Sequence, residues 1–385
     1  MKYQFVIFFS IVLIVYSAVN LYIYTRAAQA LPQGSNIRMW FGWIFLFLSI
    51  TYIAGRVLEK YYPSILVDVL TWMGSFWLAF MLYGFLLVVL IDLVRVIHHF
   101  SGILPAAFFT SNAKQWMFIL GLSGIIITVA SGYVNAISPR TRIMELAVDK
   151  TAGNLNSLKI AMASDIHLGT IIGPRRTSKL VKSINALKPD IILLAGDIVD
   201  EDLTPVINQN LGECLKQLHA PYGVYGITGN HEYIGGAESA VKYLEGHGIT
   251  MLRDSVIKIN SSFYVAGRED RDKNRFSKVK RLEVNELLNN MDKTLPIILL
   301  DHQPFALDKA VAAGVDLQLS GHTHHGQLWP LNYVTRAIYE VSMGYLKKGS
   351  THFYVSPGFG GWGPPVRIGN RPEVVLIELT FKKAL

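Results

Sequence analysis

The stretch LKIAMASDIH, residues 158–167, decides the fold of the C-terminal half of this 385-residue chain. It begins as an apolar strand and ends in a polar cluster that contains Asp165 and His167. A helical pattern follows at residues 177–187. An apolar stretch followed at once by polar residues occurs again at residues 191–195, 223–228, 297–300 and 316–319. Strands that alternate with helices predict a layered α/β core.

The polar clusters should meet along one edge of this core, because groups just past the ends of neighbouring strands gather at one rim. A hairpin-like stretch at residues 256–268 and a final run at residues 374–379 supply further strands. We therefore expect two packed sheets flanked by helices. The clusters contribute carboxylates, imidazoles and one amide: Asp165, His167, Asp197, Asn230, His302, His322 and His324.

This set of side chains predicts a metal centre. Carboxylates and imidazoles without a thiol are ligands for borderline divalent ions such as Mn²⁺, Fe²⁺ or Zn²⁺. The set is too large for one catalytic ion that must keep an open position, but it suits two ions that share a bridging carboxylate. Two ions about 3.5 to 4 Å apart can clamp a phosphate. We therefore predict a site for two metal ions that can bind a phosphate group.

Five motifs in order resemble the calcineurin-like metallophosphoesterases: D-x-H at Asp165, G-D-x-x-D at Gly196, G-N-H-E at Gly229, the single His302 after a strand, and G-H-T-H at Gly321. The resemblance covers roughly residues 158–379. It implies that one ion is held by Asp165, His167 and His324. It implies that the second ion is held by Asn230, His302 and His322, with Asp197 as the bridge.

The resemblance also implies roles for the neighbours of these ligands. His231 would contact the phosphate, where it stabilises the transition state or protonates the leaving oxygen. A metal-bridging hydroxide would be the nucleophile, and Asp197, as the bridge, would belong to the catalytic set. Three carboxylates are expected to orient ligating imidazoles rather than to bind metal themselves: Asp200, Glu232 and Asp301.

The tail at residues 356–373 is similar to that of the membrane-associated bacterial branch of this family. Within it, Arg367 is a candidate phosphate contact, and Phe359 and Trp362 are candidates to touch an acyl chain or the bilayer interface. Ordinary loop packing is the alternative for all three residues. His325 departs from the family pattern, where glycine is expected, and it places a side chain in a tight turn beside the metals.

Upstream of residue 137 four segments are long and apolar enough to cross a membrane, which takes about 20 residues. They are residues 5–24, 39–55, 69–91 and 116–134. The first precedes a sequence that imitates a signal-peptidase site, but its apolar run exceeds that of a signal peptide, and we expect an uncleaved anchor. The predicted organisation is a transmembrane region at 1–137, a linker at 138–157 and the phosphoesterase domain at 158–385.

Charge and cysteine content restrict the remaining functions. The net charge of +8 is spread thinly, so we expect no nucleic-acid partner. Cys214 is the only cysteine, which excludes an intramolecular disulfide and a cysteine-rich metal site. With four spans both termini share one side, and cationic residues favour the cytoplasmic face of a bacterial inner or plasma membrane for that side. No motif indicates an oligomeric state.

These observations favour a membrane-anchored hydrolase of phosphomonoesters or phosphodiesters, with a lipid or a nucleotide-linked lipid precursor as the substrate class that a membrane tether suggests. The alternative is a non-catalytic membrane sensor or scaffold that binds metal or phosphate through a hydrolase-like domain. Complete retention of the ligand set argues against that alternative. A transporter is disfavoured because the spans lack charges at mid-membrane.

Overall fold

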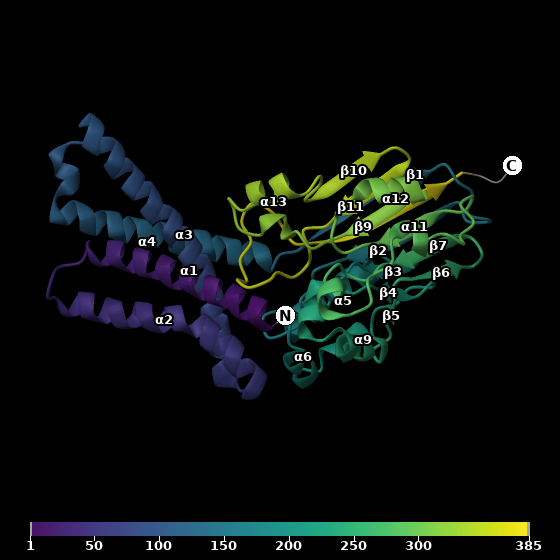
Figure 1. Ribbon diagram of the computed structural model, residues 1–385, viewed down its shortest axis with the longest axis horizontal. Helices are drawn as coiled ribbons and strands as arrows, with labels where there is room; N and C mark the ends of the chain where they lie inside the picture. The colour runs from purple at the N-terminus through teal and green to yellow at the C-terminus, as the bar shows by residue number, and fades with distance from the viewer. Residues whose placement is uncertain (1, 383–385) are drawn as a thin grey trace. The chain divides into compact units, whose positions relative to one another are not determined.

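The computed structural model describes residues 2–382, and the chain divides into two compact units, Met1–Tyr133 and Val134–Leu385. The N-terminal unit is helical, and the C-terminal unit contains all of the strands in the described part of the chain (Figure 1). The two units therefore follow the change in composition that the sequence shows near residue 137.

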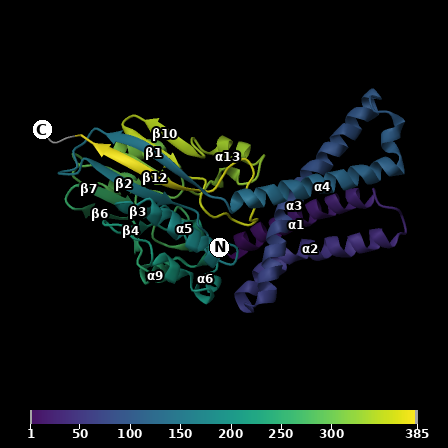
Figure 2. The same cartoon turned by 180° about the vertical axis from the view of Figure 1, so that it is seen from behind.

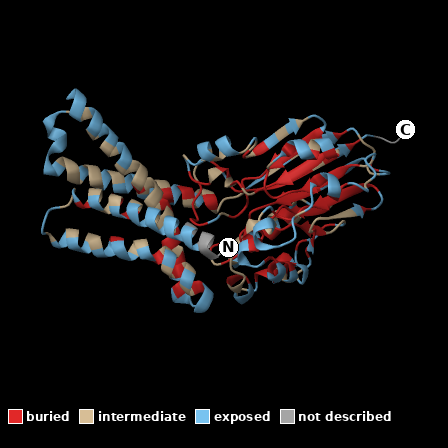
Figure 3. Cartoon of the chain, viewed as in Figure 1, coloured by how far each residue is buried: buried red, intermediate tan, exposed pale blue. Residues whose placement is uncertain are grey.

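The four predicted spans are confirmed as helices long and apolar enough to cross a membrane. They are α1 (Lys2–Ala28), α2 (Asn36–Tyr61), α3 (Ile65–Ser101) and α4 (Ser111–Ala136), with a short 3-10 helix, η1 (Ala106–Phe109), before α4. Many apolar side chains on these helices are exposed (Figure 3), as expected where lipid replaces water around the protein.

Small residues allow α2 and α3 to approach closely. A Cβ atom placed on Gly74 of α3 would lie 2.2 Å from the Cα of Tyr52, and one placed on Gly55 of α2 would lie 2.9 Å from the Cα of Thr71. Small residues at such crossings are typical of helix pairs in membranes, where close van der Waals packing drives association. These two glycines therefore allow the close packing of α2 against α3.

The C-terminal unit contains two six-stranded mixed sheets, as the sequence predicts. The first has the order β1 (Arg140–Val148), β12 (Glu373–Phe381), β2 (Ser157–Ala163), β3 (Ile191–Leu194), β4 (Val224–Gly226) and β5 (Thr250–Met251). The second has the order β10 (Gly344–Lys348), β11 (Thr351–Val355), β9 (Leu317–Ser320), β8 (Ile297–Leu300), β7 (Phe263–Gly267) and β6 (Ser255–Ile259).

Helices connect and flank these sheets. Those that follow strands of the first sheet are α5 (Pro174–Ala186), α6 (Thr204–Asn208), α7 (Leu211–Leu215), α8 (Asn230–Gly235) and α9 (Ala237–Glu245). Those associated with the second sheet are α10 (Lys273–Phe276), α11 (Val284–Leu287), α12 (Leu307–Ala313), the 3-10 helix η2 (His324–Gly326) and α13 (Asn332–Ile338). The fold class is thus confirmed.

The core lies between the sheets, and the strand β8 shows how it forms. Ile298 and Leu300 pack into the cluster shared with the first sheet, while Ile297 and Leu299 pack against α11 and α12. Alternate residues of a strand point to opposite faces, so an uninterrupted apolar strand must be covered on both sides. The sequence IILL of β8, repeated in β3, meets this requirement, and both strands are fully buried (Figure 3).

The strand β1 lies within residues 138–157, which we expected to form a linker. It pairs in parallel with β12 from Arg140, opposite Glu373, to Val148, opposite Phe381 (Figure 2). Its outer positions are mostly exposed, as at the edge of a sheet, and its charged residues conceal the strand in the sequence. The strands β5, β10 and β11 were also not predicted; β5 has only two residues, and β10 carries Lys347 and Lys348.

Candidate metal centre

Five strands of the two sheets deliver the candidate ligands. In the first sheet, Asp165 and His167 follow β2, Asp197 follows β3, and Asn230 begins α8 after β4. In the second sheet, His302 follows β8, and the pair His322 and His324 follows β9. The strands β2, β3 and β4 are parallel, as are β8 and β9. Their carboxyl ends therefore present these side chains at one rim.

The backbone is held in the left-handed region at several of these positions. The φ angle is 48° at Asp165, 50° at Asp197 and 70° at His322. Residues with side chains occupy this region at a cost of about 1–3 kcal/mol each, and such strain persists where surrounding contacts enforce it, commonly at functional sites. The strained turns after β2, β3 and β9 thus mark the rim independently of the side-chain chemistry.

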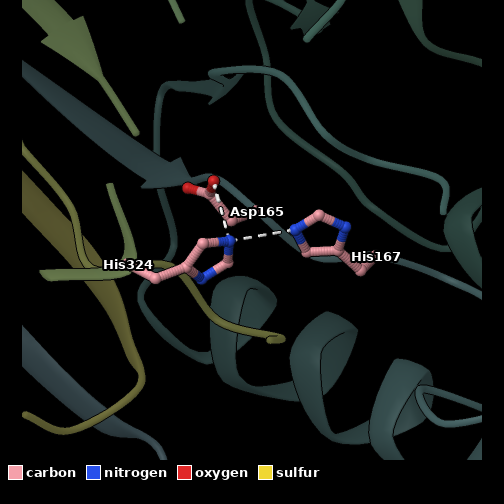
Figure 4. A group of neighbouring side chains, drawn as sticks. All are labelled: Asp165, His167 and His324. Atoms are coloured by element: carbon pink, nitrogen blue, oxygen red, sulfur yellow. Dashed lines mark hydrogen bonds and ion pairs between the residues drawn. The ribbon is translucent and has the colours of Figure 1, made fainter. Parts of the chain in front are cut away.

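Asp165, His167 and His324 form the first group of candidate ligands (Figure 4). The Nε2 atom of His324 lies 3.5 Å from Oδ1 of Asp165 and 3.1 Å from Nε2 of His167. Two ring nitrogens and a carboxylate oxygen therefore face one point, which is the arrangement a shared cation requires.

Asp197, His302 and His322 form the second group. The Oδ2 atom of Asp197 lies 3.1 Å from Nε2 of His302, and Nδ1 of His322 lies 2.8 Å from Oδ1 of Asn230. The same Oδ2 atom of Asp197 is 3.8 Å from Nε2 of His167, in the first group. Asp197 is thus placed between the two groups.

The arrangement of His302 fits a metal ligand. Its Nδ1 lies 2.7 Å from the carbonyl oxygen of Ala195, which can only accept, so Nδ1 carries the proton. Its buried Nε2 forms no hydrogen bond, although it lies 3.1 Å from Oδ2 of Asp197. A cation between these two atoms would give Nε2 a partner, and the donor set is one that borderline divalent ions take.

The protonation of the neighbouring groups agrees with this fit. Burial, assisted by the charge of His302, lowers the pKa of His322 to about 3, so its ring is neutral, the form that coordinates metals. Burial opposes ionisation of Asp197, but His302 and His231 outweigh it and hold the pKa of Asp197 well below its usual range. The candidate bridge is therefore a carboxylate.

His231 lies beside both groups and is 6% exposed. Its Nδ1 is 3.1 Å from Oδ1 of Asp200, and its backbone N–H donates to Oδ1 of Asp197 at 2.9 Å. Burial lowers the pKa of His231, but Asp197 and Asp200 outweigh burial and raise it to about 9. His231, Asp200 and His167 also form a third group that could hold an ion.

The contacts of Glu232 and Asp301 differ from the prediction that these two carboxylates orient imidazoles. Glu232 accepts hydrogen bonds from the backbone N–H groups of Ile198, Val199 and Gly229 at 2.6 to 2.9 Å, and so joins the turn after β3 to the start of α8. The carboxylate of Asp301 pairs with the guanidinium groups of Arg268, at 2.6 Å, and Arg281, at 3.0 Å. Asp200 does contact an imidazole, that of His231.

Arg367 is buried, with 1% of its surface exposed, and this contradicts the prediction of a substrate contact. Its guanidinium donates to the carbonyl oxygens of Pro357 and Gly360 and to Oδ1 of Asn370, each at 2.7 Å. It also lies 3.3 Å from Nδ1 of His324. Burial lowers the pKa of Arg367 to about 9. Its contacts connect the tail loop to the turn that carries His324.

We expect replacement of Arg367 by methionine to destabilise the C-terminal unit by on the order of 3 kcal/mol, because the buried acceptors on Gly360 and Asn370 lose a charged donor. Thermal unfolding of the full chain in detergent measures this change. Arg367→Lys, which keeps the charge but not the planar group, should recover part of the loss. A raised KM with unchanged unfolding temperature would instead identify a substrate contact.

Two glycines of the motifs lie so close to ligand carboxylates that a side chain would not fit there. The spacing of the ligands in the sequence does not reveal this requirement. A Cβ atom on Gly229 would lie 2.1 Å from Oδ1 of Asp197, and one on Gly321 would lie 2.2 Å from Oδ2 of Asp165. The amide of Asn370, also missed, donates to the carbonyl oxygen of His324 at 3.0 Å. These residues fix the positions of the candidate ligands.

The side chain of His325 is accommodated within its turn. The residue is left-handed, with φ of 47°, which explains why glycine is expected at this position. It is 4% exposed, and its Nδ1 lies 2.9 Å from Oγ of Ser342. The imidazole therefore contacts the segment before β10 and is absent from all three candidate ligand groups found in the described chain.

Trp362 provides an apolar surface beside His231. Its ring centroid is 6.1 Å from that of His231, and the residue is 46% exposed. The carbonyl oxygen of Trp362 accepts from the side chain of Gln327 at 3.0 Å, which fixes the loop to the segment after η2. Phe359, by contrast, is fully buried, so loop packing is the correct description for that residue.

Comparison with known proteins agrees with this geometry. The family model described as Calcineurin-like phosphoesterase matches residues 158–326. An uncharacterized metallophosphoesterase of Aquifex aeolicus is 34% identical over 227 residues, which cover 58% of this chain and 86% of that protein. A transmembrane protein with metallophosphoesterase domain from Danio rerio is 33% identical over 273 residues, which cover 68% of this chain and only 62% of that protein.

The similarity to one further relative extends through the helical unit. An uncharacterized metallophosphoesterase of Campylobacter jejuni is 28% identical over 398 aligned residues, which cover 98% of this chain and 100% of that protein. The name of the Danio rerio relative also combines a transmembrane protein with a metallophosphoesterase domain.

Proposed function

This chain belongs to the calcineurin-like phosphoesterase family, and from that membership we propose that it is a membrane-anchored hydrolase that cleaves a phosphomonoester or phosphodiester with the help of two metal ions. The observation that carries the proposal is the position of Asp197 between the two ligand groups, with Oδ2 3.1 Å from His302 and 3.8 Å from His167. A carboxylate in that position suits a pair of ions.

The first ion would be held by Asp165, His167 and His324. The second would be held by Asn230, His302 and His322, with Asp197 shared by both. When bound, a pair of Mn²⁺, Zn²⁺ or Fe²⁺ ions supplies water activation at neutral pH and neutralises charge on the phosphate. The protein holds these side chains in place through the strained turns at the rim.

His231 would act on the substrate directly. Its Nδ1–H is directed at Asp200, which fixes the ring and leaves Nε2–H for the leaving oxygen of the ester. The pKa of about 9 means that the imidazolium holds its proton at neutral pH, so a proton donor is available. Asp200 acts through His231 as a positioning residue.

An amphiphilic phosphate ester is the substrate class we propose. Trp362 gives the site an exposed apolar surface beside His231. The helix α13, which follows the turn of His324, exposes Tyr333, Val334 and Ile338. Apolar surface near a phosphate site matches an ester that carries acyl chains. The four apolar helices of the same chain support a substrate that resides in a membrane.

We assign residues 1–137 to membrane anchoring and residues 158–385 to hydrolysis, with the hydrolase domain on the cytoplasmic face. The cationic residues that flank the predicted spans support that orientation. Reporter fusions at the C-terminus test it: a fluorescent protein should be active there and alkaline phosphatase inactive. Active alkaline phosphatase would place the domain on the opposite side.

The metal requirement tests the proposed reaction. Detergent-solubilised protein stripped with a chelator should lose hydrolysis of p-nitrophenyl phosphate and of bis(p-nitrophenyl) phosphate to background, and Mn²⁺, Zn²⁺ or Fe²⁺ should restore the turnover of at least one of them. Activity that persists without metal would contradict the proposal. Binding of two ions without turnover, on these esters and on phosphate esters with long acyl chains, would identify a sensor instead.

A further inference from the structure

A cavity of about 580 Å³ lies among the four helices of the N-terminal unit. This volume is within the range of small-molecule and cofactor sites. Its walls are mainly apolar and come from every one of the helices: Ile23 of α1, Phe45 of α2, Phe80 of α3 and Leu122 of α4 are examples. The interior of the cavity therefore suits an acyl chain.

Aromatic contacts connect the helices that form the walls of this cavity. The rings of Phe45 and Trp77 meet edge to face with centroids 4.8 Å apart, and those of Phe41 and Phe118 do so at 5.7 Å. The indole N–H of Trp77 donates to Oδ1 of Asn20 at 3.0 Å, which fixes the orientation of that ring. The cavity is thus formed by oriented side chains, as preformed binding sites are.

One end of the cavity is cationic. Arg26 lies at the end of α1, Arg95 lies in the last two turns of α3, and Lys114 lies in the first turn of α4. These positions lie at one end of the unit because consecutive helices run in opposite directions. Asp92 is the one acidic residue that lines the cavity in the described chain. Three cations and one carboxylate give this end of the cavity a net charge of +2.

The ion pairs at this end leave positive charge available. Asp92 accepts from Nε of Arg26 at 2.8 Å, from Nη1 of Arg95 at 3.2 Å and from the hydroxyl of Tyr22 at 2.6 Å. Among the side chains that the structure describes, the ammonium of Lys114 has no hydrogen-bond or ion-pair partner. An anion placed here would meet two arginines fixed by Asp92 and a lysine free to turn towards it.

We propose that this cavity is a binding site for an anionic phospholipid, whose acyl chain enters the apolar interior and whose phosphate lies at the end formed by Arg26, Arg95 and Lys114. Basic pockets between transmembrane helices bind anionic headgroups, since the lipid phosphate neutralises the positive charge that Asp92 leaves uncompensated. The site is independent of the metal centre, and its readout is lipid binding rather than hydrolysis.

Photo-crosslinking in lipid nanodiscs tests the site. The full chain is placed in nanodiscs made of unlabelled phosphatidylcholine. A small fraction of a probe lipid is added, either phosphatidylglycerol or phosphatidylcholine, and both probes carry the same diazirine-labelled acyl chain. Phosphatidylglycerol should label peptides from α3 and α4 that line the cavity at least about fivefold more than phosphatidylcholine does, because each cation near a headgroup contributes roughly that factor. Equal labelling by both probes would overturn the proposal.

Variants connect the labelling to the cavity. Lys114→Gln should reduce labelling by phosphatidylglycerol about fivefold. Lys60→Gln makes the same change on α2 at a residue outside the cavity, and it should leave labelling by phosphatidylglycerol unaltered. Val88→Trp should reduce labelling by filling the interior. Unchanged labelling in Lys114→Gln would exclude the cationic end as the headgroup site.

Competition with unlabelled ligands needs no variant. Phosphatidylglycerol should displace the probe, whereas inorganic phosphate should not, because the apolar interior contributes to binding. Displacement by inorganic phosphate would show that the cationic end binds the free anion and would overturn the assignment of a lipid.

Discussion

Replacement of Asp197 by asparagine should remove bound metal and hydrolytic activity together, with a loss in turnover of more than about 100-fold. Second-shell partners of metal ligands typically contribute 10- to 100-fold, so a carboxylate shared by two ions should exceed that range. Oδ2 of Asp197 faces His302 and His167, and an amide there would remove the negative charge from both groups at once.

The backbone around Asp197 should tolerate this change. Oδ1 accepts the N–H of His231 at 2.9 Å, and the oxygen of an asparagine can keep that bond while its NH₂ group faces His302. Metal content per chain and turnover at saturating metal are the measurements. Asp308→Asn, at an exposed carboxylate of α12 that pairs with Lys348, is the matched control. Full metal content with normal turnover in Asp197→Asn would show that Asp197 is not the bridge.

Replacement of His231 by alanine should leave metal content intact and reduce turnover by roughly 10²-fold or more, the range expected for a lost general acid. The imidazole lies beside both principal ligand groups but belongs to neither, and its Nδ1 is directed at Asp200. Removal of the side chain therefore removes a proton donor without removing a ligand of either group. His219→Ala, at an exposed histidine, is the control.

The leaving group distinguishes a proton donor from a structural residue. A p-nitrophenolate departs without protonation, whereas an alkoxide does not, so His231→Ala should lose more activity on alkyl phosphates than on p-nitrophenyl phosphate. Equal losses on both esters would indicate stabilisation of phosphate charge rather than proton transfer. A fall in metal content would instead make His231 a ligand in the group with His167 and Asp200.

The sequence by itself determined the fold class, the four apolar helices and the residues that gather at the rim. The reason is that these features are local. An apolar run such as IILL in β3 or β8 must be buried, and the polar residues that follow it must lie at the end of that strand. Once β2 and β3 are parallel, their ends coincide, and Asp165 and Asp197 lie at the same edge of the first sheet.

The tertiary structure alone decided which partner each charged side chain has. Arg367 is buried against carbonyl oxygens, Glu232 binds backbone amides, and Asp301 pairs with arginines, because the contacts come from segments distant in the sequence. The same holds for the strand β1, whose charged residues conceal its pairing with β12, and for the cavity among the four helices. A residue's charge limits which partners can stabilise it, but only the folded chain brings one of them within reach.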